Sequence, residues 1–516
     1  MLSPTLPAYS GPYAISTTDL ELPVDSPRSF GHAVLRKTGA PALQLDTVLV
    51  TLYYPANEHR KGSGQRQHWL QRPANKTAAG YARAFGKNEW FIKTFLWIIG
   101  ARIRLPVEGD AGLAFKQNDV QGKGEMKQKE GTPAVVSGAR NSTDTLVIDE
   151  TVQGDDRFPL IIFSHGLTGT RTTYSAWCGE IASRGYVVAA IEHRDGSGPI
   201  SVVRLENGET RVVDYIKAEE HLDFPPPHKP LTSMQFRTSQ LAMRLAEIQS
   251  TLSLLKRIND GEGGAVAAEN RRKDYGGEGV VGKWLAGWKG QIAMDQFVMA
   301  GHSFGGATTI QVLRAGATEF PFVRGIALDP WVEPIPPAPD VPLDNALSAV
   351  TSLVETSTRS SNPAPTVPPV GEESAPLDVK VPLLVINSEG FTTWKSHYGL
   401  VRKVVEAVEG GKGWLFTLIG SIHTSFSDLP VLVPFIARRA GARVEAKLAV
   451  CRIVEACAEF LAGEGQAKEV LGQKVEPGDE NGTRPGEGEP VGKDGKKKTP
   501  MAGEPGVMRT HVRGQE

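Results

Sequence analysis

The amino-acid sequence predicts an α/β fold in which a mostly parallel central sheet is covered by helices on both faces. Residues 158–166, 185–193 and 381–389 are short apolar runs that end in glycine or polar residues, as expected of strands buried on both faces. Residues 231–258 place apolar side chains at helical spacing with few helix breakers, and so do residues 443–462. Buried strands that alternate with helices are typical of a parallel sheet between two helical layers.

The chain divides into one large domain and a polar tail. We expect the domain to span residues 1–462. Residues 463–516 are rich in Gly, Glu, Lys and Pro with almost no aromatic residues, which predicts a disordered tail. Gly-, Pro- and polar-rich stretches interrupt the domain as insertions near residues 106–150, 259–290 and 336–378. Further strands are predicted at residues 45–56, 297–300 and 322–330.

The composition excludes several classes of protein. The 516 residues are 40% hydrophobic and carry a formal net charge of -1, so the chain has enough apolar side chains for a large core and no excess charge for binding nucleic acid. Three cysteines offer neither a disulfide framework nor zinc-ligand spacing, which predicts a cytoplasmic setting. We expect no signal peptide, because the N-terminal residues lack a basic n-region and an apolar h-region. We expect no transmembrane helix, because the longest apolar stretch, residues 91–99, is far short of the roughly 18–20 residues that a span needs.

The main chemical signal is Gly301-His302-Ser303-Phe304-Gly305, a G-x-S-x-G motif. A nucleophilic serine of this type sits on a sharp turn between a strand and a helix, where small neighbours avoid steric clashes. The motif follows the apolar run FVMA and precedes the helical run ATTIQVLRA, which is the context that the turn requires. The sequence therefore predicts an α/β-hydrolase fold with Ser303 as the nucleophile, and an ordinary glycine-rich turn is the weaker alternative.

A second motif, FSHGLTG, closes the first buried strand. Hydrolases of this architecture use an HG-containing loop at this place, and one of its amides joins the amide that follows the nucleophile to bind the oxyanion. By position, these two donors are the backbone amides of Leu167 and Phe304.

A nucleophilic serine needs a base and an acid, which follow it in the order acid, histidine in this fold. His423 comes just after an apolar strand, where the last loop of the sheet brings it over the serine, so it is the predicted base. His397 is interpreted as a surface residue. Asp329 and Glu389 each end a predicted strand, and the pattern alone leaves both open as the acid, with a modest lead for Asp329.

Several blocks of sequence resemble the platelet-activating-factor acetylhydrolase family, meaning the plasma-type and type II intracellular enzymes, or group VII phospholipases A2. In chain order they are FSHGLTGTRTTYSAWCGEIASRGYVVAAIEHRDGS, GHSFGGATTIQVL, GIALDPWVEPI, INSE and GSIHTSFSD. The resemblance implies Ser303 as nucleophile, Asp329 as acid and His423 as base. It also implies Leu167 and Phe304 as the oxyanion donors and leaves Glu389 with a structural role.

The resemblance implies a serine-dependent, calcium-independent esterase that uses no cofactor and no metal. Its implied substrate is a phospholipid with a short or oxidised sn-2 acyl group, such as 1-alkyl-2-acetylglycerophosphocholine. Two alternatives stay open. The chain could be a general carboxylesterase or polyester hydrolase with the same catalytic residues, or a catalytically silent hydrolase fold that acts as a binding protein.

Two further segments have more than one interpretation. Residues 88–105 combine aromatic and basic side chains, as in a helix that lies on a lipid surface. Their composition favours a core or lid helix packed on the sheet, whereas lipid substrates favour transient contact with a membrane surface. Residues 192–196, EHRDG, superficially match a kinase catalytic loop, but the sequence has no glycine-rich nucleotide loop to accompany them, so we expect a structural polar network.

Overall fold

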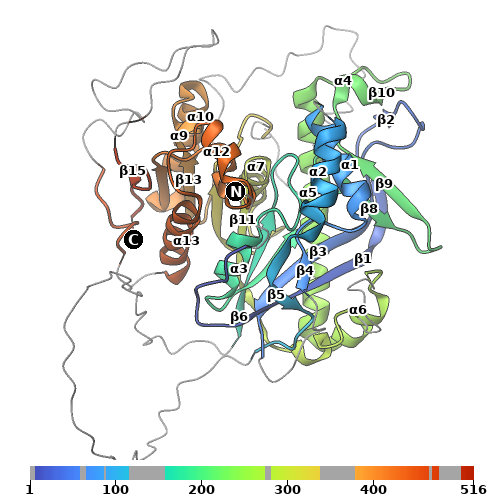
Figure 1. Ribbon diagram of the computed structural model, residues 1–516, viewed down its shortest axis with the longest axis horizontal. Helices are drawn as coiled ribbons and strands as arrows, with labels where there is room; N and C mark the ends of the chain where they lie inside the picture. Colours follow the sequence, from blue (N-terminus) through green and yellow to red (C-terminus); the bar gives the residue numbers. More distant parts are fainter. Residues whose placement is uncertain are drawn as a thin grey trace, which may run out of the picture.

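The computed structural model describes residues 6–57, 66–86, 89–114, 157–272, 281–336, 378–463, 468–475, 501 and 503–515. Its centre is an 11-stranded sheet in the order β15-β14-β13-β12-β11-β6-β7-β3-β1-β5-β4 (Figure 1). The strands of this sheet are β1 (Ile15–Ser29), β3 (Gln44–Pro55), β4 (Arg66–His68), β5 (Arg104–Gly109), β6 (Phe158–Ser164), β7 (Val187–Ile191), β11 (Ile292–His302), β12 (Phe322–Leu328), β13 (Leu383–Ser388), β14 (Gly413–Leu418) and β15 (Met508–Val512). Two small sheets pair β2 (Val34–Leu35) with β10 (Leu222–Asp223) and β8 (Ile200–Arg204) with β9 (Thr210–Asp214).

Helices surround the large sheet. They are α1 (Ala74–Phe85), α2 (Glu89–Ile98), α3 (Ser175–Ala182), α4 (Ala218–His221), α5 (Ser233–Arg257), α6 (Gly263–Glu269), α7 (Phe304–Ala315), α9 (Glu389–Thr392), α10 (Lys395–Glu406), α11 (Leu429–Leu432), α12 (Pro434–Arg439) and α13 (Ala446–Ala462). Shorter turns of helix are η1 (Gly100–Arg102), η2 (Ile258–Glu262), η3 (Leu285–Trp288), η5 (Glu409–Gly411) and η6 (His423–Phe426).

The middle of the sheet is parallel. Strand β6 pairs in parallel with β7 and β11, and β11 to β14 continue in parallel. Strands β3 and β1 extend the sheet as antiparallel neighbours beyond β7. The predicted α/β-hydrolase fold, with a mostly parallel sheet, is therefore confirmed.

Strand β6 shows why helices cover both faces. Its alternate side chains Leu160 and Ile162 belong to one buried cluster, which includes Ile310 of α7, whereas Ile161 and Phe163 belong to the other. Successive side chains of a strand point to opposite faces, so a strand that is apolar throughout needs a covering layer on each side. Helices α5, α7 and α10 contribute to the first cluster, and α3 and α13 contribute to the second.

The carboxyl ends of the parallel strands meet at one edge of the sheet. The HG loop follows β6, Ser303 follows β11, Asp329 follows β12 and the segment with His423 follows β14. Open α/β sheets carry their functional residues at this edge. The order of the strands therefore brings residues that are far apart in sequence to one place.

The predicted tail is partly wrong. Residues 463–516 were expected to be disordered, yet β15 lies at the end of the chain and pairs antiparallel with β14. Met508, Thr510 and His511 are buried, and His511 Nε2 is 2.8 Å from Thr417 Oγ1. A composition averaged over a long polar stretch conceals a five-residue strand. Residues 464–467 and 476–500 lie outside the described part of the chain.

The insertions are described only in part. Strand β5 extends to Gly109, so the first insertion begins later than the predicted residue 106. The segment near 259–290 contains η2, α6 and η3, and its side chains Val266, Leu285 and Trp288 are buried. Residues 115–156 and 337–377 hold most of the other inserted sequence and lie outside the described residues.

Helix α2 is not a core helix, which was one of the alternatives that the composition favoured for residues 88–105. No side chain of α2 is buried, and Trp90, Phe91 and Trp97 are 78%, 62% and 55% exposed. The composition favoured a core or lid helix packed on the sheet, and the core alternative is wrong for α2, because other helices cover the sheet. Ile103 and Leu105 of the same segment are buried. Among the helices that the structure describes, none has the length and apolarity needed to cross a bilayer.

We expect the C-terminal strand to stabilise the domain. Deleting residues 503–516 removes the neighbour of β14 together with the buried side chains of Met508, Thr510 and His511. The loss of this buried area should lower the free energy of unfolding by roughly 2–4 kcal/mol, measured by urea denaturation. The control is Val507→Ala, which truncates a side chain that is 48% exposed and should change little. A truncated chain as stable as this control would contradict the role of β15.

Candidate active site

Ser303 lies on a strained turn between β11 and α7. Its backbone has φ 57° and ψ −117°, a conformation that residues with a side chain rarely adopt. Two neighbouring glycines make the turn possible: a Cβ on Gly301 would lie 2.3 Å from the carbonyl oxygen of Gly305, and one on Gly305 would lie 1.9 Å from that of Ser164. The expected turn for a nucleophile is therefore present, and it places the serine at the N-terminus of a helix.

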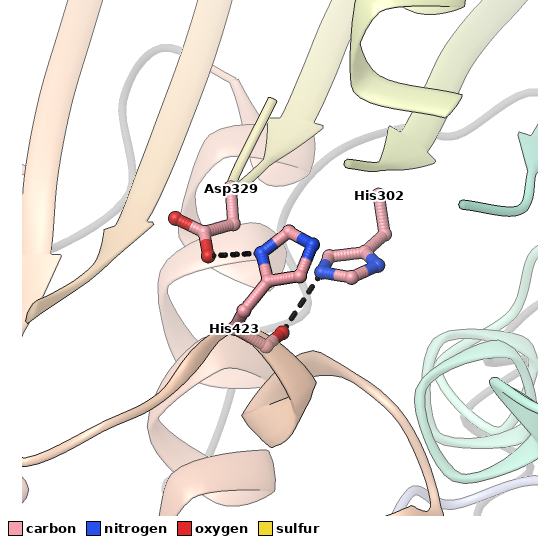
Figure 2. A group of neighbouring side chains, drawn as sticks. All are labelled: His302, Asp329 and His423. Carbon is pink, nitrogen blue, oxygen red and sulfur yellow. Dashed lines mark hydrogen bonds and ion pairs between the residues drawn. The ribbon is translucent and has the colours of Figure 1, made fainter. Parts of the chain in front are cut away.

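Ser303, Asp329 and His423 form a continuous hydrogen-bonded chain. His423 Nδ1 is 2.7 Å from Asp329 Oδ2, and His423 Nε2 is 2.9 Å from Ser303 Oγ. Figure 2 shows the dashed contact between the Asp329 carboxylate and the His423 ring. Because a carboxylate accepts the proton of Nδ1, the neutral imidazole has a free electron pair on Nε2 facing the serine hydroxyl.

The Asp329 carboxylate is fixed from a second side. Its Oδ1 accepts a hydrogen bond of 2.7 Å from the backbone amide of Ser388, and its Oδ2 accepts one of 2.7 Å from the Ser388 hydroxyl. The side chain is fully buried. These bonds leave the carboxylate one orientation toward His423, and Ser388 is a partner that the sequence pattern did not indicate.

The alternative acid and the alternative base lie elsewhere. Glu389 accepts hydrogen bonds from the backbone amides of Gly420 and Met501 and forms an ion pair with Arg443. Its carboxylate therefore holds two loops in place and does not contact His423. The interpretation of His397 as a surface residue is wrong, because its side chain is completely buried.

His397 supports the backbone that follows Asp329. Its Nδ1 is 2.8 Å from Glu333 Oε1 and its Nε2 is 2.8 Å from the carbonyl oxygen of Pro330. The histidine lies on the inward face of α10, together with Tyr398 and Val401. The sequence alone does not show which face of this helix is buried, because the residues that contact His397 are distant in sequence.

Aromatic rings hold the His423 imidazole in its plane. The ring of Phe391 stacks on it with a centroid distance of 4.3 Å and an interplanar angle of 6°, and the His302 ring lies 4.6 Å away. The His423 side chain remains 36% exposed, whereas Ser303 is 6% exposed. The imidazole of His423, the predicted base, is thus fixed in orientation and still exposed on one side.

The predicted oxyanion donors lie beside the serine. A Cβ on Gly166 would lie 2.9 Å from Ser303 Cβ, so the loop that carries Leu167 passes directly against the nucleophile. Thr168 N donates to the carbonyl of Ser197, but no hydrogen bond of the Leu167 amide occurs among the described residues. Phe304 is the first residue of α7, and the first amides of a helix have no partner inside it. Neither the Leu167 amide nor the Phe304 amide has a hydrogen-bond partner among the described residues.

Residues 192–196 form the expected structural polar network. Arg194 pairs with Glu21 at 2.8 Å, and Asp195 pairs with Arg244 of α5 at 2.8 Å. All four side chains are fully buried. Arg244 also donates to the carbonyl of His165 at 2.9 Å, which connects this network to the HG loop. One feature of the sequence could have indicated this network: Arg244 lies on the apolar face of the helix predicted at residues 231–258.

A second serine–histidine–acid chain lies in the same network. Ser164 Oγ is 2.7 Å from His193 Nε2, and His193 Nδ1 is 2.5 Å from Glu247 Oε2. All three residues are buried with at most 1% exposure, and burial holds the pKa of His193 well below its usual range. Since no ligand reaches Ser164 from solvent, this chain is structural.

The ligand atoms of His302, Asp329 and His423 lie within 4.8 Å of one another, a spacing that a metal ion would also accept. Both nitrogens of His423 are already engaged, with Asp329 and with Ser303. Both nitrogens of His302 are engaged as well, with Tyr174 and with the His423 carbonyl. The group therefore fits a hydrogen-bonded relay better than a cation site.

Asp428 anchors the segment that carries His423. Its carboxylate accepts hydrogen bonds from the Ser175 amide at 3.0 Å, the Ser175 hydroxyl at 2.6 Å, the Ala176 amide at 2.9 Å and the Trp69 indole at 2.9 Å. Burial raises the pKa of Asp428 to about 7, while these bonds act in the opposite direction and favour the charged form. The first turn of α3 has no capping side chain of its own, and Asp428 supplies the acceptor.

We expect Asp428→Asn to destabilise the protein. The new amide group would face a backbone N–H, so one buried donor would lose its acceptor at a cost of about 1–3 kcal/mol in the free energy of unfolding. Urea denaturation measures the change. The matched control is Asp295→Asn, whose carboxylate is 64% exposed and pairs with Arg157 on the surface, and whose loss should cost less than ~0.5 kcal/mol. Equal effects of the two substitutions would contradict the anchoring role.

Comparisons with known proteins agree with this geometry. The sequence model of the family "Platelet-activating factor acetylhydrolase, isoform II" matches residues 128–339 and 366–475. The chain is 29% identical over 280 residues to a platelet-activating factor acetylhydrolase of Gallus gallus, covering 53% of each chain. It is 35% identical over 187 residues to that of Bos taurus, covering 35% of this chain and 36% of the relative. A putative phospholipase A2 of Schizosaccharomyces pombe is 27% identical over 308 residues, covering 59% and 58%.

A solved structure supports the fold. The ferulic acid esterase of Streptomyces cinnamoneus superposes with a TM-score of 0.50 at 15% identity, covering 91% of this chain and 96% of the esterase. In sequence, the chain matches about half of the length of the Gallus gallus relative. The family model nevertheless matches well over half of this chain, on both sides of the gap between residues 339 and 366. The chain therefore belongs to the platelet-activating factor acetylhydrolase, isoform II, family.

Proposed function

We propose that this protein is a serine esterase that hydrolyses the sn-2 acetyl ester of 1-alkyl-2-acetylglycerophosphocholine and related phospholipids. The observation that carries the proposal is the hydrogen-bonded chain from Ser303 through His423 to Asp329 in a member of this family. The proposed catalytic residues are these three, and the proposed oxyanion donors are the amides of Leu167 and Phe304.

The reaction has two steps. In the first, Ser303 Oγ attacks the ester carbonyl while His423 Nε2 takes its proton, and Asp329 stabilises the imidazolium that forms. The Leu167 and Phe304 amides bind the negative oxygen of the tetrahedral intermediate, and His423 then protonates the leaving lysophospholipid oxygen. In the second step, water attacks the acyl-serine with His423 as base and releases acetate.

Each charge that develops during the proposed reaction is stabilised by a group of the protein. The oxyanion faces two backbone amides, and the loss of one such donor typically lowers turnover by about 10²–10³-fold. The imidazolium faces Asp329, which is itself held by Ser388. We therefore propose that hydrolysis is independent of calcium.

The first test measures acetate release from 1-alkyl-2-acetylglycerophosphocholine in the presence of EDTA. We expect rapid release by the unmodified protein, none by Ser303→Ala, and a fall in turnover of about 10⁴-fold in Asp329→Asn. The matched control is Glu389→Gln, which changes a partly buried carboxylate that pairs with Arg443 and not with His423, and which should retain most of the activity.

Other outcomes of this test would redirect the proposal. If the protein ignores the phospholipid but cleaves p-nitrophenyl acetate through Ser303, the reaction stands and the protein is a general carboxylesterase. If calcium removal abolishes turnover, the proposed independence is wrong. If neither ester is cleaved and Ser303 resists a fluorophosphonate probe, the fold acts as a silent binding protein.

We also propose that α2 contacts a phospholipid surface. Its side chains Trp90, Phe91 and Trp97 are exposed, and exposed groups of large apolar side chains mark sites of contact with a partner or a membrane. Aromatic side chains with neighbouring basic groups are typical of helices that lie at the headgroup level of a bilayer. Lys93 on the same helix supplies such a charge.

We expect the double substitution Trp90→Ser with Phe91→Ser to weaken binding to phosphatidylcholine vesicles by about tenfold or more, because two large exposed apolar groups are removed. Vesicle co-sedimentation measures binding, and hydrolysis of dissolved p-nitrophenyl acetate should stay unchanged. The control is Val323→Ser, which changes an exposed apolar side chain near the start of β12 and leaves α2 intact. Undiminished vesicle binding by the double variant would refute the role of α2.

A further inference from the structure

We propose that Tyr174 and His302 are positioning residues that couple the oxyanion loop to the base through one directed chain of hydrogen bonds. The chain runs from the Gly166 amide to Tyr174 Oη at 3.1 Å, from Tyr174 Oη to His302 Nδ1 at 2.8 Å, and from His302 Nε2 to the carbonyl oxygen of His423 at 3.0 Å. Figure 2 shows the last contact, between the His302 ring and the backbone of His423. The inference rests on the proposed function, because it concerns the residues that this function uses.

The direction of each bond in the chain is fixed. The carbonyl of His423 only accepts, so His302 Nε2 carries a proton and donates it. Burial and the neighbouring His423 hold the pKa of His302 well below its usual range, so the ring is neutral and its Nδ1 is an acceptor. Burial also raises the pKa of Tyr174, so its hydroxyl keeps its proton and donates it to Nδ1. The remaining electron pairs of the phenol oxygen accept the Gly166 amide.

The two ends of the chain are the two parts of the site that must be placed relative to each other. Gly166 precedes the proposed donor Leu167 and lies against Ser303, where even a Cβ would come within 2.9 Å. The His423 carbonyl belongs to the residue whose ring faces Ser303 Oγ. A change in either bond therefore moves an oxyanion donor or the base with respect to the nucleophile.

The two residues in the middle of this series of hydrogen bonds come from separate elements. Tyr174 immediately precedes α3, and its ring lies 5.4 Å from that of His302 at the end of β11. Both residues are buried, with 3% and 4% exposure. Neither residue touches Ser303 Oγ or the proposed oxyanion position through a hydrogen bond of the described residues, so their effect on the reaction is indirect.

The test compares turnover of p-nitrophenyl acetate per active site, counted by fluorophosphonate labelling. We expect Tyr174→Phe to lower kcat by about 10–100-fold with KM changed less than about twofold, because a small misplacement of reacting groups is costly while ground-state binding is not affected. His302→Leu should have a similar effect. His302→Gln keeps a donor toward the His423 carbonyl and should recover much of the lost kcat.

The double variant Tyr174→Phe with His302→Leu separates a chain from two independent contacts. Residues of one chain should not multiply their effects, so the double variant should be no slower than the slower single variant. The matched control is Tyr53→Phe, which removes another buried phenol hydroxyl, bonded at 3.2 Å to the carbonyl of Arg171 and not to this chain. It should retain kcat.

Each result decides one question. Equal kcat values for Tyr174→Phe and Tyr53→Phe, or multiplied losses in the double variant, would overturn the positioning chain. If Tyr174→Phe does not fold, the comparison of His302→Gln with His302→Leu decides, and equal turnover of those two would overturn it. Ser303→Ala is measured in parallel. Activity of Ser303→Ala would refute the proposed function itself. If Ser303→Ala is inactive, a negative result with the Tyr174 and His302 variants refutes only the positioning role of these two residues.

Discussion

The site depends on one strained backbone turn. A non-glycine residue with positive φ, such as Ser303, costs of order 1–3 kcal/mol, and it persists where the surrounding structure fixes it. Here the fixing contacts are the approach of Gly301 to Gly305 and of Gly305 to the Ser164 carbonyl. Any side chain at either glycine would separate β11 from α7 or from β6. The same close packing therefore sets the spacing of the central strands and the position of the serine hydroxyl beyond the carboxyl end of β11.

A layer of paired charges supports this turn from the side of α5. Arg244 contacts Asp195 after β7, the His165 carbonyl after β6 and the face of the Phe304 ring at 4.3 Å. Burying charged groups costs free energy unless each group is paired. Such a network therefore contributes more to fixing a single conformation of the surrounding strand ends than to the free energy of unfolding. Its effect is to lock the ends of β6, β7 and β11 in register, which is where both proposed oxyanion donors begin.

Local sequence predicted the parts of the site that depend on local geometry. The strand, turn and helix around Ser303 follow from a few neighbouring residues, and so do the buried strands. The choice of Asp329 over Glu389 needed the family resemblance, because both residues end strands and only their tertiary partners differ. The burial of His397, the exposure of α2 and the pairing of β15 depend on which surfaces other elements leave free, and no local pattern contains that information.

The first turn of α3 explains how such distant residues stay in place. Tyr174 at its N-cap position bonds to the Gly166 amide and to His302, and the next two amides bond to Asp428 in the segment that carries His423. Each bond contributes about 1 kcal/mol, which would not hold a mobile loop alone. Their convergence on one rigid helical turn makes them act together. Because Ser175 and Asp428 are separated by 253 residues in sequence, it is tertiary contacts such as this one and the Tyr174–His302 hydrogen bond that relate the position of the proposed base to that of the proposed oxyanion donors.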